Sequence, residues 1–515
     1  MASAKPGPGE GRTTEGPAPV DVFRRSGSRL REALDPDLTR EFYPGPWEHM
    51  RHELVAIHAF DKAHCLMLVE EGIIPRDIGR ELLRGLREME QHDMLEARRS
   101  VGASHHSGEL WLTQRLGESV AGWLHVGRSS GDLGAVAWSI TARAKVVDVW
   151  ERVLALRAAL LRLASEHTDT LMPGYSGAQH AQPITFGFYL HSWEEALRRD
   201  TERLEQAFRR LNRSPAGAAI MTGSDFPLNR HRVGDLLGYD ELRTNCHDAI
   251  FHWDPLVETA SGLTLLMANV SRIADDFHLW ATHEFAMADL PDRYCITSSI
   301  MPQKKNPWAT VFIRSQSARV QGRLGSILAM TRTRQDEFDP HVIVPWELWE
   351  MAEAVLPALD VAVGTLTTLR VNRARMEEQA GAHWATATDL AATLVRKAGV
   401  PWRTAHQITA VIVRVAHERN IRPGELTSAM IDEAASAYGA PAIGLDDDTL
   451  RRALDPREFI ARRRTVGGPA SETLRHQLSV SERILQRDRA ARSDVTRRLE
   501  EAGHRLESGI DAALA

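Results

Sequence analysis

The stretch AVAWSITARAKVVDVWERVLALRAALLRLASEHTDTL, residues 135–171, contains neither glycine nor proline. Its apolar residues recur at spacings of three and four, at Val146, Val149, Val153, Leu156, Leu160 and Leu163. This spacing is typical of a helix that packs in a bundle. A helix over the whole stretch would be roughly 50 Å long at about 1.5 Å per residue. We therefore predict that this segment is one long helix of an elongated bundle.

Four further segments lack helix breakers over most of their length: residues 188–213, 263–290, 308–321 and 346–356. Loops rich in glycine and proline separate them, and strand patterns are scarce. The sequence therefore predicts an all-α protein with an elongated central five-helix bundle and a smaller helical domain on each side. We place a disordered tail, an N-terminal helical domain, the bundle, a C-terminal helical domain and a charged, solvated helix at residues 1–20, 21–131, 132–372, 373–478 and 479–515.

Composition excludes several classes of function. The chain has 515 residues, of which 43% are apolar and 26% charged, and its net charge of -6 gives no electrostatic case for binding nucleic acid or an anionic membrane. No apolar run approaches the ~18 residues of a membrane span. Cys65, Cys246 and Cys295 are far apart and form no disulfide or zinc pattern. We expect a cytoplasmic protein without a metal or cofactor.

The loop TSSIMPQKKNP, residues 297–307, carries the groups most suited to chemistry. Ser298 offers a hydroxyl as base or nucleophile, and Lys304 offers a cation for an anionic substrate. A hydroxyl is a poor base unless a nearby positive charge stabilises its alkoxide. The lysine could supply that field and also hold a carboxylate. A solvated loop with incidental lysines is the alternative.

The same string resembles the signature loop G-S-S-x-M-P-x-K-x-N-P of the aspartase/fumarase superfamily and departs from it only at Thr297. Further segments follow in the order and spacing of argininosuccinate lyases. They are HVGRSSGD at 125–132, LMPGYSGAQHAQPI at 171–184, FPLNR at 226–230, SRIADDFHLW at 271–280 and TATDLAATLVRKAGVPWRTAHQI at 386–408. From about residue 45 to about 478, the chain is identified as a divergent member of the argininosuccinate lyase-like branch.

The resemblance implies a homotetramer whose active sites are shared between chains and which acts on a small-molecule dicarboxylate. The implied reaction is β-elimination from a substituted succinate with release of fumarate. Ser298 would be the base, and Lys304 and Asn306 would hold the succinyl carboxylate, with help from Ser176. The resemblance assigns weaker substrate-binding roles to Ser299, Met301, Gln335, Arg128, His105 and Gln182.

The chain departs from the family at the pair that delivers a proton to the leaving group. The family's histidine is Gly177 here, and its glutamate partner is Val311. Neither replacement titrates. The loss of both groups predicts a remodelled pocket, in which His105, His106 or His180 donates the proton or the leaving group needs none. The alternative is a catalytically lapsed, structural or partner-binding homologue.

Other departures lie where the family grips the arginine moiety of its substrate. A tyrosine, a glutamine and a lysine of the family correspond to Met330, Gln335 and Phe338. A pocket that lacks a charge partner rejects a charged group by roughly several kcal/mol. We therefore expect a substrate other than argininosuccinate. Another N-substituted aspartate is one choice, and nitrosuccinate is a second because nitrite departs as a stable anion.

Overall fold

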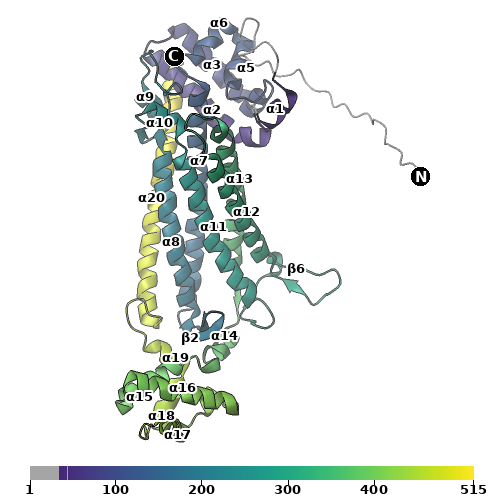
Figure 1. Cartoon of the computed structure of the whole chain (residues 1–515). Helices are drawn as coiled ribbons and strands as arrows, with labels where there is room; N and C mark the ends of the chain where they lie inside the picture. The colour runs from purple at the N-terminus through teal and green to yellow at the C-terminus, as the bar shows by residue number, and fades with distance from the viewer. Residues whose placement is uncertain (1–33, 43–44) are drawn as a thin grey trace, which may run out of the picture.

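The computed structural model describes residues 34–42 and 45–515, so the tail predicted at residues 1–20 lies outside the described residues. Long helices run through the middle of the molecule, and groups of shorter helices lie at both ends (Figure 1). The described strands are short and pair only two by two. This arrangement confirms the predicted all-α class and the elongated central bundle.

Five long helices form the bundle: α7 (Ser130–Glu166), α8 (Phe186–Leu211), α11 (Asp254–Trp280), α12 (Trp308–Met330) and α13 (Asp339–Thr367). α7 packs against α8 and α13, and α11 packs against α8 and α12. The large rings of Trp150, Phe186, Trp280 and Trp349 are buried between them. With 37 residues, α7 is roughly 55 Å long at about 1.5 Å per residue.

Capping side chains fix where these helices begin. Ser129 Oγ accepts a hydrogen bond from the Asp132 amide, and the Asp132 carboxylate accepts one from the Ser129 amide at 2.9 Å. This reciprocal pair satisfies amides that the first turn of α7 leaves without helical partners. Thr185 caps α8 with a single bond, because its Oγ1 accepts a hydrogen bond from the Phe188 amide at 3.1 Å. The two caps place the start of α7 at Ser130 and that of α8 at Phe186.

Two prolines lie inside α13, and the segment predicted at residues 346–356 is therefore too short. Pro345 and Pro357 flank the predicted segment, and each disfavours a helix locally because proline lacks an amide donor and its ring crowds the preceding turn. The helix nevertheless runs from Asp339 to Thr367. Val344, Leu348, Trp349 and Val355 are all buried in the bundle. The packing of these side chains outweighs the local cost of the prolines.

The remaining helices form a group at each end of the bundle. The group at the N-terminal end of α7 comprises α1 (Pro36–Glu41), α2 (Trp47–Glu70), α3 (Arg76–Gln91), α4 (Met94–Arg99), α5 (Ser107–Leu116), α6 (Glu118–Ala121), η2 (Gly122–His125), α9 (Arg230–Leu236) and α10 (Cys246–Phe251). The opposite group comprises α14 (Arg373–Ala380), η4 (Ala382–Trp384), α15 (Ala387–Ala398), α16 (Trp402–Arg419), η5 (Pro423–Glu425), α17 (Ser428–Tyr438), α18 (Asp447–Leu454) and α19 (Pro456–Ala461). Each group has its own buried apolar cluster. The domain boundaries after residues 131, 372 and 478 stay predictions.

The last helix, α20 (Ser471–Leu514), returns along the whole bundle (Figure 1). Leu478 and Leu485 contribute to the bundle core, and Leu506 and Ile510 contribute to the core at the N-terminal end of α7. A solvated, salt-bridged helix packed on the tetramer was expected from about residue 479, because charged residues dominate this segment. The helix is longer, beginning at Ser471, and one of its faces is buried against the same chain. None of the helices in the described ranges has the length and apolar character needed to cross a bilayer.

Short strand pairs replace two of the loops expected from glycine and proline. β1 (Leu171–Ser176) and β2 (Gln179–Thr185) form an antiparallel hairpin, and β6 (Ile296–Thr297) pairs in the same sense with β7 (Lys305–Asn306). β5 (Ala288–Asp289) pairs with β8 (Arg370–Val371), and β3 (Arg213–Ser214) runs parallel to β4 (Glu241–Leu242). The first two hairpins carry the predicted succinyl-binding residues.

Candidate active site

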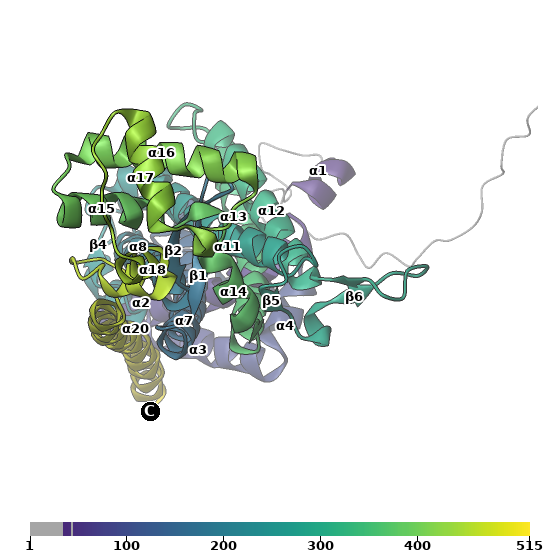
Figure 2. The same cartoon turned by 90° about the horizontal axis from the view of Figure 1, so that it is seen from below.

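The loop at residues 297–307 is the tip of a hairpin that projects from the bundle (Figures 1 and 2). Thr297 pairs with Lys305 at its base, a position that suits a β-branched residue. At the tip, Ser298 Oγ accepts hydrogen bonds from the amides of Ile300 and Met301 at 3.3 and 3.2 Å. Donors aimed at an oxygen favour its charged form. The turn therefore supports the alkoxide that a serine base requires.

The two lysines of the hairpin differ in their partners. Lys305 Nζ lies 2.8 Å from Asp289 and 3.1 Å from Asp292. The hydrogen bond to Asp289 is the largest cause of the raised pKa of Lys305. Lys304 is exposed, and its ammonium contacts no carboxylate within the described ranges. Lys304 is thus the cation of this loop that is available to an anionic ligand.

Three predicted substrate-binding residues lie close to Ser298 along the hairpin. Ser299 and Met301 are exposed at the tip, beside Ile300, which is 83% exposed. Asn306 Nδ2 donates to the Ile296 carbonyl at 3.3 Å, across the strand pair. The hairpin thus gathers Ser298, Lys304 and Asn306 on one element, with Lys304 exposed and the other two partly exposed. Their roles stay predictions.

The β1–β2 hairpin turns at the position of the missing histidine. Ser176 pairs with Gln179, so Gly177 and Ala178 form a two-residue turn, with φ of 58° and 61°. Left-handed conformations at both central residues are the mark of a type I′ turn. A Cβ added to Gly177 would meet no atom within 4 Å. Backbone conformation, not space, therefore makes this position suited to glycine.

Side chains near this turn are open to solvent or form local contacts. Ser176 is exposed, and Gln182 Nε2 donates to Thr388 Oγ1 at 3.2 Å. The ring of His180 packs edge-on against Tyr175 and His383. Burial and then the neighbouring His383 lower the pKa of His180. His180 is therefore a poor proton donor at neutral pH in this arrangement.

Two predicted binding residues lie at the other end of the bundle, before the start of α7. His105 Nε2 lies 2.8 Å from Glu53 Oε2. Arg128 is buried and donates to Asp61 Oδ1 at 2.7 Å. Although burial opposes ionisation, Arg128 and Arg98 hold the pKa of Asp61 below its usual value. Arg128 thus directs its guanidinium to a structural carboxylate in the described chain, and its predicted role in binding substrate stays a prediction.

An apolar cavity of about 350 Å³ opens beside His105. It is lined by Phe42, Met50, Glu53, His105, Ser130, Gly131, Trp138, Phe338, His341, Val342 and Trp346. Glu53 is 1% exposed, and its carboxylate accepts hydrogen bonds from the indoles of Trp138 and Trp349 at 3.1 and 3.3 Å. Sequence reasoning missed Glu53, because a single glutamate inside a helix carries no motif.

His341 is the second residue of this cavity that the sequence did not indicate. It is 8% exposed, and its ring lies 4.6–5.5 Å, between centroids, from those of Trp138, Phe251, Trp253 and Phe338. Burial and then the neighbouring His105 lower the pKa of His341 to about 4. Its Nε2 has no hydrogen-bond partner among the described residues. The ring is therefore neutral at pH 7.

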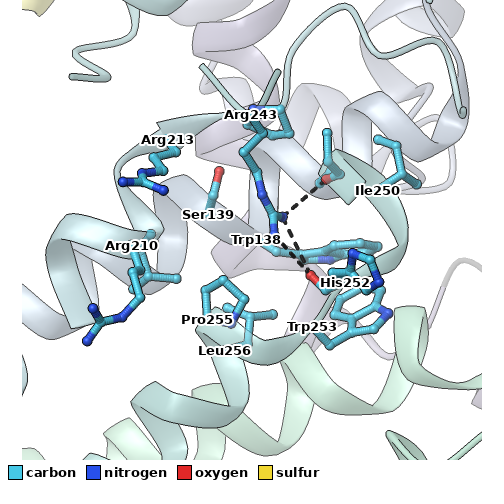
Figure 3. Close-up of a pocket in the computed structure, with 14 residues that line it drawn as sticks. Trp138, Ser139, Arg210, Arg213, Arg243, Ile250, His252, Trp253, Pro255 and Leu256 are labelled. Atoms are coloured by element: carbon cyan, nitrogen blue, oxygen red, sulfur yellow. Dashed lines mark hydrogen bonds between the residues drawn. The ribbon is translucent and has the colours of Figure 1, made fainter. Parts of the chain in front are cut away.

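A smaller pocket adjoins the same tryptophans, Trp138 and Trp253 (Figure 3). Arg243 reaches into it and donates to the carbonyls of Ala249 and His252, drawn as dashed lines in Figure 3. The other two arginines of the pocket, Arg210 and Arg213, form ion pairs with Glu258 and Glu241. Because each guanidinium has an acidic or carbonyl partner, this pocket supports the loop before α11 and offers little charge to a ligand.

Gln335 and Phe338, at two of the three arginine-binding positions, lie near these pockets. Gln335 Nε2 is 2.9 Å from His252 Nε2, on the exposed segment between α12 and α13. Phe338 lines the apolar cavity at the start of α13. A lysine at position 338 would place an ammonium at this aromatic wall. Its replacement by phenylalanine makes the cavity more apolar.

One chain does not bring all of the predicted residues together. Arg128 and His105 precede the N-terminal end of α7, whereas Ser176 and Gln182 follow its C-terminal end (Figure 1). The helix between them is roughly 55 Å long. No small ligand spans that distance. A site that used both sets would need residues from more than one copy of the chain.

Two clusters of described residues bring metal-binding atom types within 4.8 Å of one another: His106, Glu109 and His125, and His191, Glu194 and Glu195. In the first, His106 Nε2 lies 2.9 Å from Ser130 Oγ. Burial, with smaller effects from His125 and His105, lowers the pKa of His106 to about 3. In the second, a Glu194 oxygen is engaged by Arg157 at 2.9 Å. The expectation of a metal-free protein stays a prediction.

Comparisons with known proteins relate this chain to lyases. The lyase family profile matches residues 50–322, and the argininosuccinate lyase C-terminal profile matches residues 384–461. Argininosuccinate lyase of Methanothermobacter thermautotrophicus is 37% identical over 83% of this chain and 92% of its own length. The enzyme of Methanosarcina barkeri is 36% identical over 92% of this chain and 96% of its own.

Solved structures give a matching result. A variant of EDDS lyase with bound fumarate has a TM-score of 0.86 and 30% identity, covering 96% of this chain and 98% of its own. A class II fumarase from Schistosoma mansoni, at 15% identity and a TM-score of 0.66, covers 80% of this chain and 91% of its own and shares the fold.

Proposed function

Because this chain belongs to the argininosuccinate lyase-like branch of the aspartase/fumarase superfamily, we propose that it is a carbon–nitrogen lyase that releases fumarate from a substituted succinate. The observation that carries the proposal is the hairpin at residues 297–307. It holds Ser298 in a turn whose amides support an alkoxide, and it keeps Lys304 apart from the carboxylates that engage Lys305.

The proposed reaction is a β-elimination. Lys304 and Asn306 hold a carboxylate of the succinyl group, and Ser298 removes a proton from the carbon next to it. The electron pair left on that carbon spreads into the carboxylate, whose developing charge the Lys304 ammonium stabilises. The pair then forms the carbon–carbon double bond. The carbon–nitrogen bond breaks, and the nitrogen keeps its electrons.

The active form in this proposal is a homotetramer that shares its sites between chains. The length of α7 separates Arg128 and His105 from Ser176 and Gln182. Only another copy of the chain can therefore bring these two sets together. Large apolar side chains of α11 and α12 are exposed on the single chain, namely Leu265, Leu279, Trp308 and Leu328. Such residues along a helix bundle favour packing against further copies.

The substrate in this proposal is an N-substituted aspartate other than argininosuccinate, or nitrosuccinate. Gly177 lies in a tight turn, and Val311 cannot titrate, so the pair that would protonate a leaving group is missing. A general acid contributes about 10²–10⁴ in rate. That contribution is unnecessary when the nitrogen is already an ammonium and leaves as a neutral amine, or when nitrite leaves as an anion.

Release of fumarate, followed by its ultraviolet absorbance, tests the proposal. The panel contains argininosuccinate, nitrosuccinate and several N-alkylaspartates, and Ser298→Ala is the control variant. We expect fumarate from at least one member other than argininosuccinate, and a rate that collapses in the variant. A folded protein that releases no fumarate from any member would instead support the catalytically lapsed homologue.

A further inference from the structure

We propose that the apolar cavity beside His105 is the leaving-group pocket of this lyase and that it selects an alkylamine bearing an aromatic group. The cavity lies between α2, α7 and α13, which contribute Met50, Trp138, Val342 and Trp346 to its walls. This inference rests on the proposed function, since it names the substituent of the succinate that the Ser298 hairpin would hold.

Size and lining favour a bulky apolar substituent. The cavity measures about 350 Å³, far more than a nitro group fills. Phe42, Trp138, Phe338 and Trp346 present ring surface to it. Aromatic side chains bind flat apolar groups through large buried areas and offset or edge-on ring contacts. Between the two substrates considered above, the cavity therefore favours an N-substituted aspartate over nitrosuccinate.

The Glu53 carboxylate excludes a guanidinium as the preferred ligand. Its Oε2 already lies 2.8 Å from His105 Nε2 and 3.1 Å from Trp138 Nε1, and its Oε1 accepts from Trp349 Nε1. A guanidinium binds best when both oxygens are free for two parallel hydrogen bonds. A single ammonium needs only one acceptor and gains from aromatic faces nearby. The pocket thus suits an amine better than the arginine moiety.

His341 lines the pocket with a neutral side chain. Its ring contacts Trp138 and Phe338, and its pKa of about 4 keeps the imidazole neutral at pH 7. The titratable groups that line the cavity are Glu53, His105 and His341. Of these, Glu53 and His105 form a close pair, with 2.8 Å between Oε2 and Nε2. No lining lysine or arginine repels an ammonium in the described part of the chain.

This choice of leaving group also fits the missing acid. A secondary alkylamine is protonated at neutral pH, so its nitrogen carries two hydrogens before the bond breaks. Ser298 removes one proton from carbon, the carbon–nitrogen pair moves to nitrogen, and the products are fumarate and a neutral primary amine. No further proton is required. Gly177 and Val311 are then compatible with turnover.

N-benzylaspartate and N-methylaspartate are the probes, because they share the succinyl half and differ in the group that would fill the cavity. We expect kcat/KM for the benzyl compound to be about 10- to 100-fold higher, the range expected for burying a phenyl ring. Equal values, or a preference for the methyl compound, would overturn the inference while leaving the lyase proposal intact.

Two variants locate the selectivity. Val342→Trp fills the cavity, and Phe338→Lys places an ammonium at its wall. Both are expected to lower the benzyl-to-methyl ratio of kcat/KM about tenfold or more. Tyr438→Lys makes the same kind of aromatic-to-lysine change on the exposed end of α17 and should leave the ratio unchanged. Thermal unfolding of each variant shows that it is folded.

Benzylamine binding to the full-length protein separates the two proposals. Trp138 and Trp346 line the cavity, so bound amine should change tryptophan fluorescence, and Val342→Trp should abolish saturable binding. Saturable binding without fumarate release from any probe would reject the lyase and keep the pocket. Fumarate release without benzylamine binding would reject the pocket and keep the lyase.

Discussion

Arg157 Nη1 lies 2.6 Å from Asp488 Oδ2, and this ion pair joins α7 to α20 inside the molecule. Arg157 also pairs with Glu194 of α8 at 2.9 Å, and all three side chains are buried. Burial raises the pKa of Glu194 more than Arg157 lowers it. One guanidinium therefore fixes the position of the last helix against two helices of the bundle.

Asp488→Ala is expected to destabilise the protein, because it leaves the buried Arg157 with one carboxylate fewer. Removing one partner of a buried pair costs about 3–5 kcal/mol. The midpoint of urea unfolding should fall clearly. Asp494→Ala removes an exposed carboxylate that pairs with Arg497 and Arg498 on the same helix. An equal loss in both variants would contradict a special role for the buried pair.

The contrast between α20 and its expected form shows what sequence patterns omit. Its dense charges predicted a solvated helix, and most of them are exposed. Asp488 is the exception, because a partner 331 positions earlier in the chain accounts for its burial. Charge density alone does not reveal such long-range pairs. In α13, similarly, tertiary packing carries the helix through Pro345 and Pro357, beyond both ends of the segment predicted at residues 346–356.

The grouping of Ser298, Lys304 and Asn306 followed from the signature loop, because these residues lie close together in the sequence, and their roles stay predictions. The loop at residues 297–307 placed Ser298, Lys304 and Asn306 on one hairpin. The cavity that contains Glu53 and His341 did not follow from sequence, because its residues come from separate helices and match no motif. The β1–β2 turn was also not predicted, since the sequence pattern indicated Gly177 as the replacement of a catalytic histidine and gave no role to Ala178.

Ser298→Ala is expected to abolish most turnover. The variant removes the hydroxyl that the Ile300 and Met301 amides support, so kcat should fall by about 10³-fold or more while KM changes little. Initial rates of fumarate release from the best substrate measure both constants. Ser315→Ala removes a hydroxyl that donates to the Val311 carbonyl within α12 and serves as the control. Near-normal kcat in Ser298→Ala would require another base.

Lys304 and Lys305 are expected to respond differently to substitution by alanine. Lys304→Ala removes the ammonium that would hold the carboxylate and stabilise the developing charge, so kcat/KM should fall about 10²-fold or more. Lys305→Ala removes the ion pairs with Asp289 and Asp292 at the hairpin base, and a much smaller loss should follow. Steady-state kinetics on the same substrate compares the two. The reverse order would assign the carboxylate contact to Lys305.

Stability is expected to fall as the pH drops from about 6.5 to about 4. The pKa of His341 is about 4 in the folded protein, against ~6.5 in an unfolded chain. The unfolded state therefore binds a proton first, and stability present above pH ~6.5 is lost toward pH ~4. The effect of this residue is on the order of 3 kcal/mol. His106 and His167, with pKa values of about 3 and about 4, act in the same direction.

His341→Phe should weaken that pH dependence, because the aromatic ring remains and the titrating nitrogen is gone. Urea unfolding of both proteins at pH 7 and pH 5 measures the change. His417→Phe, on the exposed face of α16, is the matched control. If His341→Phe and the parent protein lose the same stability between the two pH values, His341 is not a source of the acid sensitivity.

Restoring the family's proton-donating pair is expected to fail. Gly177→His places a Cβ on a residue with φ of 58°, a left-handed conformation that costs a residue with a side chain about 1–2 kcal/mol. With Val311→Glu added, both titrating groups return, but Met330 and Phe338 still leave two of the three arginine-binding positions without polar groups. We therefore expect no more fumarate from argininosuccinate in the double variant than in the parent protein. A large gain would show that the missing pair alone sets the substrate, and that the apolar cavity does not select it.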